Sequence, residues 1–128
     1  MKRKILSLAA MVLTTITGNA QSQAFKSLTV EAYEQAIADT TVIRLDVRTS
    51  EEFAAGHIDR AINIDVLNPD FEQRATTTLP ISKTIAINCR SGKRSKRAAQ
   101  ILVRHGYRVI ELDSGYLGWV AAGKKIMR

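Results

Sequence analysis

The stretch AINCRSGKRSKRAAQIL, Ala86–Leu102, contains the single cysteine of this 128-residue chain. Apolar residues lead into Cys89 and are typical of a buried strand, while residues 95–105 have the apolar spacing of a helix. Gly92 lies in the short loop between them. Arg90 follows the cysteine directly, and four more basic residues follow Gly92: Lys93, Arg94, Lys96 and Arg97. A strand, a tight loop and a helix in this order indicate an α/β unit, with Cys89 at the end of the strand.

The same alternation continues along most of the chain. Strands are predicted at residues 25–28, 42–47, 61–64, 84–88 and 108–112, and helices at residues 30–38, 50–55, 70–77, 95–105 and 117–122. Thr49 followed by Glu52 is a capping-box sequence at the start of the second helix. The alternation predicts an α/β layer structure with a mostly parallel sheet. Ligands bind such folds at the carboxyl ends of the strands, where Cys89 is expected.

The first twenty residues have the layout of a secretory signal. A basic start, Lys2 to Lys4, precedes an apolar run of about a dozen residues, and small residues allow cleavage after Ala20 or nearby. The run is shorter than the roughly 20 residues of a membrane span. We therefore expect residues 1–20 to be removed, leaving residues 21–128 as one exported, periplasmic domain without membrane association. A buried N-terminal helix is the alternative interpretation.

Loss of that segment changes the charge of the chain. The full sequence carries a net charge of +7, whereas residues 21–128 keep 16 basic and 12 acidic side chains, a net charge of +4. This moderate charge and the expected export argue against nucleic acid as a partner. His57 and His105 have no metal-ligand spacing with Cys89, so we expect neither a metal nor a cofactor. A monomer is the default expectation for a domain of this size.

The loop after Cys89 has the composition of a site for a sulfur anion. Gly92 allows close approach of the backbone, successive N–H groups can form an anion-binding nest, and a helix N-terminus adds its dipole. Arg90, Lys93 and Arg94 add full charges. All of these favour the thiolate, which is the nucleophilic form of cysteine, and an anionic substrate. A small buried residue beside a solvated basic loop is the alternative interpretation of Cys89.

Four blocks of the chain resemble the rhodanese family of sulfurtransferases. CRSGKRS, residues 89–95, resembles the family's active-site loop. LDVRTSEEFAAGHIDRAINID, residues 45–65, resembles the upstream signature, and AAQILVRHGYRVIEL, residues 98–112, the helix and strand after the loop. SGYLGWVAAG, residues 114–123, resembles the closing block. The resemblance covers about residues 25 to 126 and implies a three-layer domain with a central, mostly parallel five-stranded sheet flanked by helices.

The resemblance also implies a reaction. Sulfane sulfur would pass from thiosulfate or a similar small anionic donor, through a persulfide on Cys89, to cyanide or a thiol, with a thioredoxin-like protein as one candidate acceptor. The residues that match the donor-binding loop are Arg90, Ser91, Gly92, Lys93, Arg94 and Ser95, and Arg94 could instead brace the loop. Asp46, Arg48 and His57 match supporting positions that hold neighbouring loops. Lys96, Arg97 and Arg104 are expected on the solvated side of their helix.

Two other functions fit parts of this pattern. A cysteine phosphatase resembles Cys-x5-Arg, but here the sixth residue after Cys89 is Ser95 and arginine stands one position earlier, which shortens the cradle for a phosphate. A rhodanese-like binding module without turnover is the second alternative. The chain also departs from the family at Asp65, where proline is frequent, and at Ser114, where glycine is frequent. We expect both turns to lie away from the thiol.

Overall fold

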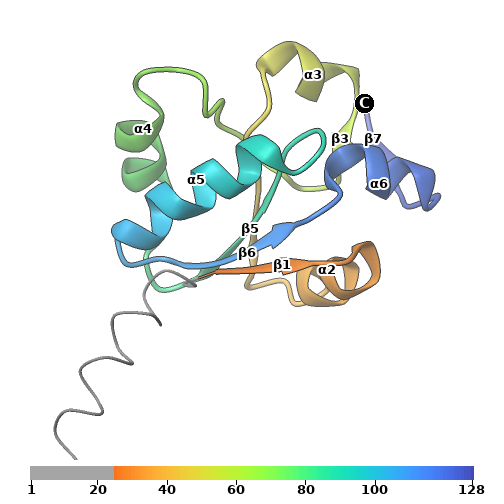
Figure 1. Ribbon diagram of the computed structural model, residues 1–128, viewed down its shortest axis with the longest axis horizontal. Coiled ribbons are helices and arrows are strands. Elements are labelled where there is room, and N and C mark those ends of the chain that lie inside the picture. Colours follow the sequence, from red (N-terminus) through yellow and green to blue (C-terminus); the bar gives the residue numbers. More distant parts are fainter. Residues whose placement is uncertain (1–24) are drawn as a thin grey trace, which may run out of the picture.

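The computed structural model describes residues 25–128, and Figure 1 shows how their helices and strands are arranged. The predicted signal, residues 1–20, lies outside the described residues. The strands of the main sheet are β1 (Phe25–Leu28), β2 (Ile43–Asp46), β4 (Ile62–Asn63), β5 (Thr84–Asn88) and β6 (Arg108–Leu112). They are all parallel to their neighbours, in the order β1-β6-β5-β2-β4. The predicted parallel five-stranded sheet is therefore confirmed, and β5 is its middle strand.

Helices cover both faces of this sheet. They are α2 (Val30–Ile37), α3 (Ser50–Ala55), α4 (Phe71–Thr78), α5 (Lys93–Arg104) and α6 (Gly115–Ala121). In Figure 1, α4 and α5 lie on one side of the sheet and α2 on the other. One apolar core packs Leu45 and Ile87 of the sheet with Leu102 of α5, and a second packs Tyr33 of α2 against Trp119 of α6. The three-layer architecture is thus confirmed.

Local hydrogen bonds explain where the helices next to the sheet begin. The Thr29 hydroxyl accepts from the N–H of Ala32 at the start of α2, and the capping box of Thr49 and Glu52 is complete at α3. Helix α5 begins at Lys93, two residues before its predicted start. Gly92, with φ of 103°, turns the chain into this helix without a side-chain cap.

Two short strands were not predicted. β3 (His57–Ile58) and β7 (Ile126–Met127) form an antiparallel pair that joins the end of α3 to the end of the chain. Helix α6 begins at Gly115 rather than at the predicted residue 117. No helix within residues 25–128 is long and apolar enough to cross a membrane.

Candidate active site around Cys89

Cys89 lies directly after β5, at the carboxyl edge of the sheet. Its side chain is in the apolar core that faces α5 and is only 1% exposed. The backbone N–H of Gly92 donates to Cys89 Sγ at 3.1 Å, and Ser95 Oγ lies 3.4 Å from the same sulfur. The loop therefore curls around the sulfur and offers it two polar neighbours. A backbone N–H in this position stabilises a sulfur anion, and it is one member of the nest of N–H groups expected from the loop composition.

Helix α6 packs against the backbone of this loop. The N–H of Tyr116 donates to the carbonyl of Cys89 at 2.8 Å, and that of Leu117 donates to the carbonyl of Arg90 at 3.0 Å. Contact is so close that a Cβ on Gly115 would lie 2.3 Å from the Arg90 oxygen. The turn that contains Ser114 therefore packs against the cysteine loop. Our expectation that this turn lies away from the thiol was wrong, because α6 folds back onto the carboxyl edge of the sheet.

Close packing against the Asp113 carbonyl requires glycine at position 92. It has a positive φ of 103°, and a Cβ there would lie 2.1 Å from the Asp113 carbonyl oxygen. Backbone atoms cannot move aside as a flexible side chain can, so any larger residue would displace the loop or the chain at Asp113, directly after β6. The position of the Gly92 N–H at the sulfur depends on this close fit.

Part of the predicted loop forms an exposed cationic rim. Arg90, Ser91 and Lys93 are exposed, and within residues 25–128 neither Arg90 nor Lys93 forms an ion pair. A hollow of about 520 Å³ opens beside the start of α5 and is lined by Leu67, Lys93, Arg94, Lys96, Arg97 and Gln100. Lys93 lines this hollow and Arg90 does not, and exposed cations without an ion-pair partner attract small anions.

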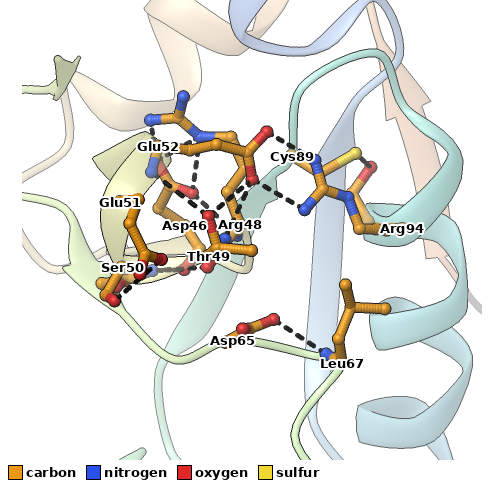
Figure 2. A network of polar contacts seen from close by, with 12 residues as sticks. Asp46, Arg48, Thr49, Ser50, Glu51, Glu52, Asp65, Leu67, Cys89 and Arg94 are labelled. Atoms are coloured by element: carbon orange, nitrogen blue, oxygen red, sulfur yellow. Dashed lines mark hydrogen bonds and ion pairs between the residues drawn. The ribbon is translucent and has the colours of Figure 1, made fainter. Parts of the chain in front are cut away.

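Arg94 braces the loop. Its guanidinium donates to both carboxylate oxygens of Glu52, at 2.8 and 2.9 Å, and so ties α5 to α3 (Figure 2). This hydrogen bonding lowers the pKa of Glu52 to about 2 and raises the pKa of Arg94. Of the two roles expected for Arg94, bracing is the one its contacts show. Glu52 was expected only to cap α3, because nothing in the sequence indicates a partner 42 residues away.

Asp46 and Arg48 form a buried ion pair at the adjoining end of β2. The guanidinium Nε of Arg48 lies 3.0 Å from Asp46 Oδ1, and the pair is almost without exposure. Arg48 also donates to the carbonyl of Gly56 at 2.7 Å and stacks 4.1 Å from the ring centre of Tyr116. These contacts join β2, the end of α3 and helix α6, so both residues hold the loops around the site.

The two histidines lie away from the sulfur. His57 Nδ1 is 2.9 Å from the carbonyl oxygen of Phe53, and the two rings stack with centres 3.8 Å apart. His105, at the end of α5, pairs with Glu72. Within the described part of the chain, neither histidine hydrogen-bonds Cys89, and no group of three or more potential metal ligands occurs. His57 thus packs against α3, in keeping with its expected supporting role.

The polar interior of the site was not predicted from the sequence. Glu111 of β6 is completely buried and accepts from Ser27 Oγ and Ser95 Oγ, each at 2.5 Å. Lys96 was expected to face solvent, but it pairs with Asp113 at 2.8 Å and lies 3.3 Å from Glu111. The Lys96 side chain is 41% exposed, so the expectation of solvent contact holds, but its charge is paired because a long side chain can reach a buried partner from a half-exposed position. A lone acidic residue in an apolar strand, VIEL, was the available signal.

Comparisons with known proteins agree with this geometry. The model of the rhodanese-like domain family matches residues 29–122. Protein HIGH ARSENIC CONTENT 1, mitochondrial, of Arabidopsis thaliana is 37% identical over 89 residues, which are 62% of this chain and 53% of that protein. The chain thus spans about half of that relative's length. A protein named Sulfurtransferase from Allochromatium vinosum is 33% identical over 99 residues, 76% of this chain and 90% of that protein.

A solved structure has the same fold. The crystal structure of a rhodanese-related protein from Thermoplasma volcanium superposes with a TM-score of 0.71 at 24% sequence identity. The superposition covers 80% of this chain and 97% of that one.

Proposed function

Because the chain belongs to the rhodanese-like domain family, we propose that it is a sulfurtransferase that carries sulfane sulfur on Cys89. The observation that supports this most is the Gly92 N–H, which donates to a buried Sγ at 3.1 Å. A hydrogen bond to a sulfur anion is worth more than one to a neutral thiol, so this donor favours the nucleophile. The related Allochromatium vinosum protein is itself named a sulfurtransferase.

The proposed reaction is a double displacement. The Cys89 thiolate attacks the outer sulfur of thiosulfate, a new S–S bond forms, and sulfite leaves with the electron pair of the donor's S–S bond. The product is a Cys89 persulfide. Cyanide or a thiolate then attacks the outer sulfur of the persulfide, leaves as thiocyanate or a new persulfide, and returns the Cys89 thiolate. Each step conserves charge and needs no further oxidant or reductant.

The exposed cations give this proposal its donor class. Arg90 and Lys93 stand at the rim without an ion-pair partner in the described region, so they can attract a small dianion such as thiosulfate. The donor approaches the sulfur from the side of the exposed rim. On the buried side, Ser95 and Glu111 are already hydrogen-bonded to each other. Thiosulfate as the donor, and cyanide or a thiol such as that of a thioredoxin-like protein as the acceptor, are part of the proposal.

Export is proposed on the sequence alone. The basic start and short apolar run of residues 1–20 support removal of this segment after Ala20 or nearby and a periplasmic location. N-terminal sequencing of the protein recovered from a periplasmic extract would identify the cleavage position. An intact Met1 on that protein would rule out removal of the segment, and absence of the protein from the periplasmic extract of cells that make it would rule out this location.

A turnover assay tests the enzyme against the alternative of a binding module. Purified protein is mixed with thiosulfate and cyanide, and thiocyanate is measured with time. The proposal expects many turnovers for the wild type and none above the uncatalysed rate for Cys89→Ser. The same assay with a dithiol acceptor and sulfide as the readout compares acceptors. A folded wild type that gives no product with either acceptor would favour the binding module.

A further inference from the structure

The proposed reaction makes no use of the carboxylate of Glu111. This side chain projects from β6 beneath α5, has no exposure to solvent, and is flanked by the Ser27 and Ser95 hydroxyls, each with an oxygen–oxygen distance of 2.5 Å. A buried carboxylate is costly unless polar partners compensate it, so its retention beside the nucleophile requires an explanation. Its neighbour Ser95 is also the residue whose hydroxyl contacts the Cys89 sulfur.

The hydroxyl of Ser95 links the sulfur to this carboxylate. Ser95 Oγ lies 3.4 Å from Cys89 Sγ, 2.5 Å from Glu111 Oε2 and 3.1 Å from the carbonyl oxygen of Gly92. A hydroxyl has one proton to donate and two lone pairs to accept with. While Cys89 is a thiol, its S–H can donate to Ser95, and Ser95 donates to the Glu111 carboxylate. Both contacts are then satisfied.

The thiolate requires the opposite arrangement. A sulfur anion can only accept, so Ser95 must turn its proton toward Sγ. The short contact between Ser95 and Glu111 then keeps a hydrogen bond only if the carboxyl group carries the proton. Cys89 Sγ, Ser95 Oγ and Glu111 Oε2 can therefore share one acidic proton, which is bound either at the sulfur or at the carboxyl group. Ser95 is the side chain that hydrogen-bonds Sγ among the described residues, so this proton has a direct route through its hydroxyl.

From this geometry we propose that Glu111, acting through the Ser95 hydroxyl, takes up the Cys89 thiol proton when the nucleophile forms and returns it when the thiol is restored. The S–H bond breaks as an O–H bond forms on Ser95, whose own O–H bond breaks as one forms on Glu111. Negative charge moves from the carboxylate to the sulfur, and no external acid or base is consumed. Glu111 does not touch the sulfur and is a positioning residue for the proton.

Charged and polar groups from several elements surround the two ends of this relay. On the carboxyl end, Lys96 of α5 lies 3.3 Å from Glu111 Oε1 and is itself held by Asp113, which favours the carboxylate. From α2 on the opposite face comes Tyr33, whose pKa is raised by burial, so it remains neutral. On the sulfur end the Gly92 N–H favours the thiolate. The sulfur also lies in the field of the Arg94 guanidinium, whose own charge is shared with Glu52.

A coupled pair that shares a proton has a characteristic pH profile, which tests this proposal. The rate of Cys89 alkylation by iodoacetamide, a neutral reagent, is measured from acid to alkaline pH. For the wild type we expect two rising steps separated by a plateau, because the singly protonated pair contains a fixed fraction of thiolate. Glu111→Gln removes the second titrating group, so its profile should have one step. On the acid side of that step its rate should fall about tenfold per pH unit.

Two further variants complete the test. Ser95→Ala removes the link and should lower the plateau about tenfold, since the thiolate loses a charge-assisted hydrogen bond. Glu72→Gln removes an exposed carboxylate that pairs with His105 at the far end of α5, and it should keep both steps. Retained far-ultraviolet circular dichroism and cooperative unfolding show that each variant is folded.

The outcomes are separable from those of the proposed function. The proposal relies on that function only in taking Cys89 as the nucleophile, and alkylation needs no sulfur donor. A single step in the wild type overturns the relay whether or not Glu111→Gln folds, and so does a two-step profile that survives in Glu111→Gln. Absence of thiocyanate production, with a two-step alkylation profile, would instead overturn sulfur transfer and leave the relay standing.

Discussion

On the outer side of Cys89, Arg90 and Lys93 extend into solvent, whereas on the inner side Ser95 and Glu111 are closed off from it. The outer groups are free to meet a ligand, but solvent screens their charges. Ser95 and Glu111 hydrogen-bond each other, and Ser95 also contacts the sulfur, in a region of low dielectric where such bonds are stronger. We conclude that the outer side is suited to attracting a donor and the inner side to controlling the sulfur.

The basic residues that follow Cys89 illustrate the same contrast. They look equivalent in the sequence, yet Lys93 is exposed and unpaired among the described residues, Arg94 is fixed to Glu52, and Lys96 reaches inward to Asp113 and Glu111. Their positions on α5 decide this division, because consecutive helical residues point in different directions. Net charge alone would have assigned all of them to substrate binding.

The largest effect, a loss of folding stability, is expected for substitution of Gly92, which lies in the loop between the outer and inner sides. Gly92→Ala should lower the free energy of unfolding by about 3 kcal/mol, since it combines a positive φ with a Cβ 2.1 Å from the Asp113 carbonyl. Gly123→Ala is the matched control. It has a similar φ of 73° and no atom within 4 Å of its Cβ, so a loss of only about 1 kcal/mol is expected. Urea denaturation measures both, and equal losses would show that crowding at Gly92 is unimportant.

A smaller, pH-dependent effect is expected at the contact between α3 and α5. The pKa of Glu52 is about 2 in the folded protein, mainly through the hydrogen bond from Arg94, against an ordinary value of 4.5. A lowered pKa stabilises the folded state above the ordinary value, and this contribution is lost as pH falls from about 4.5 toward 2.

Glu52→Gln checks this sign directly. The variant keeps a side-chain oxygen for the capping box but loses the charge opposite Arg94. At neutral pH it should be less stable than the wild type by about 1 kcal/mol, a value that allows for partial exposure of the pair. The difference should shrink as the pH approaches 2. A difference that stays constant between neutral and acid pH would mean that the ion pair does not stabilise the fold.

The smallest effect is expected at the outer rim. Lys93→Ala should raise the KM for thiosulfate about threefold with little change in kcat, because an exposed cation contributes modestly and is screened by salt. The increase should diminish at high ionic strength. Arg104→Ala removes one positive charge from the far end of α5 and serves as the control for net charge. If both variants raise KM equally, Lys93 has no specific place at the rim.

Much of the fold could be predicted because its signals are local. The strand of residues 84–88 has an apolar centre at residues 85–87, and the helix of residues 50–55 has both members of its capping box within four residues. The β3–β7 pair could not be predicted in this way. Each strand has two residues, and their partners are nearly 70 positions apart in the chain. Only the folded chain brings such segments together.

The residues of the site differ in the same way, between those that are contiguous in the sequence and those that depend on long-range contacts. Cys89, Gly92 and the basic rim could be identified because they are contiguous in the sequence. Glu111 and Glu52 could not, since their contacts to Ser95 and Arg94 span 16 and 42 residues. The position of the turn at Ser114 was also misjudged, because the return of α6 to the cysteine loop is a tertiary contact. Pattern and spacing thus identify the outer side of the site more readily than the inner side.

The central claim, that Cys89 carries a transferable sulfur, is tested most directly by the intact mass of the protein after incubation with thiosulfate. We predict that the wild type gains the mass of one sulfur atom, that the gain is lost on adding cyanide or a thiol, and that Cys89→Ser gains nothing. A wild type of unchanged mass, or a sulfur adduct that persists in Cys89→Ser, would contradict the account.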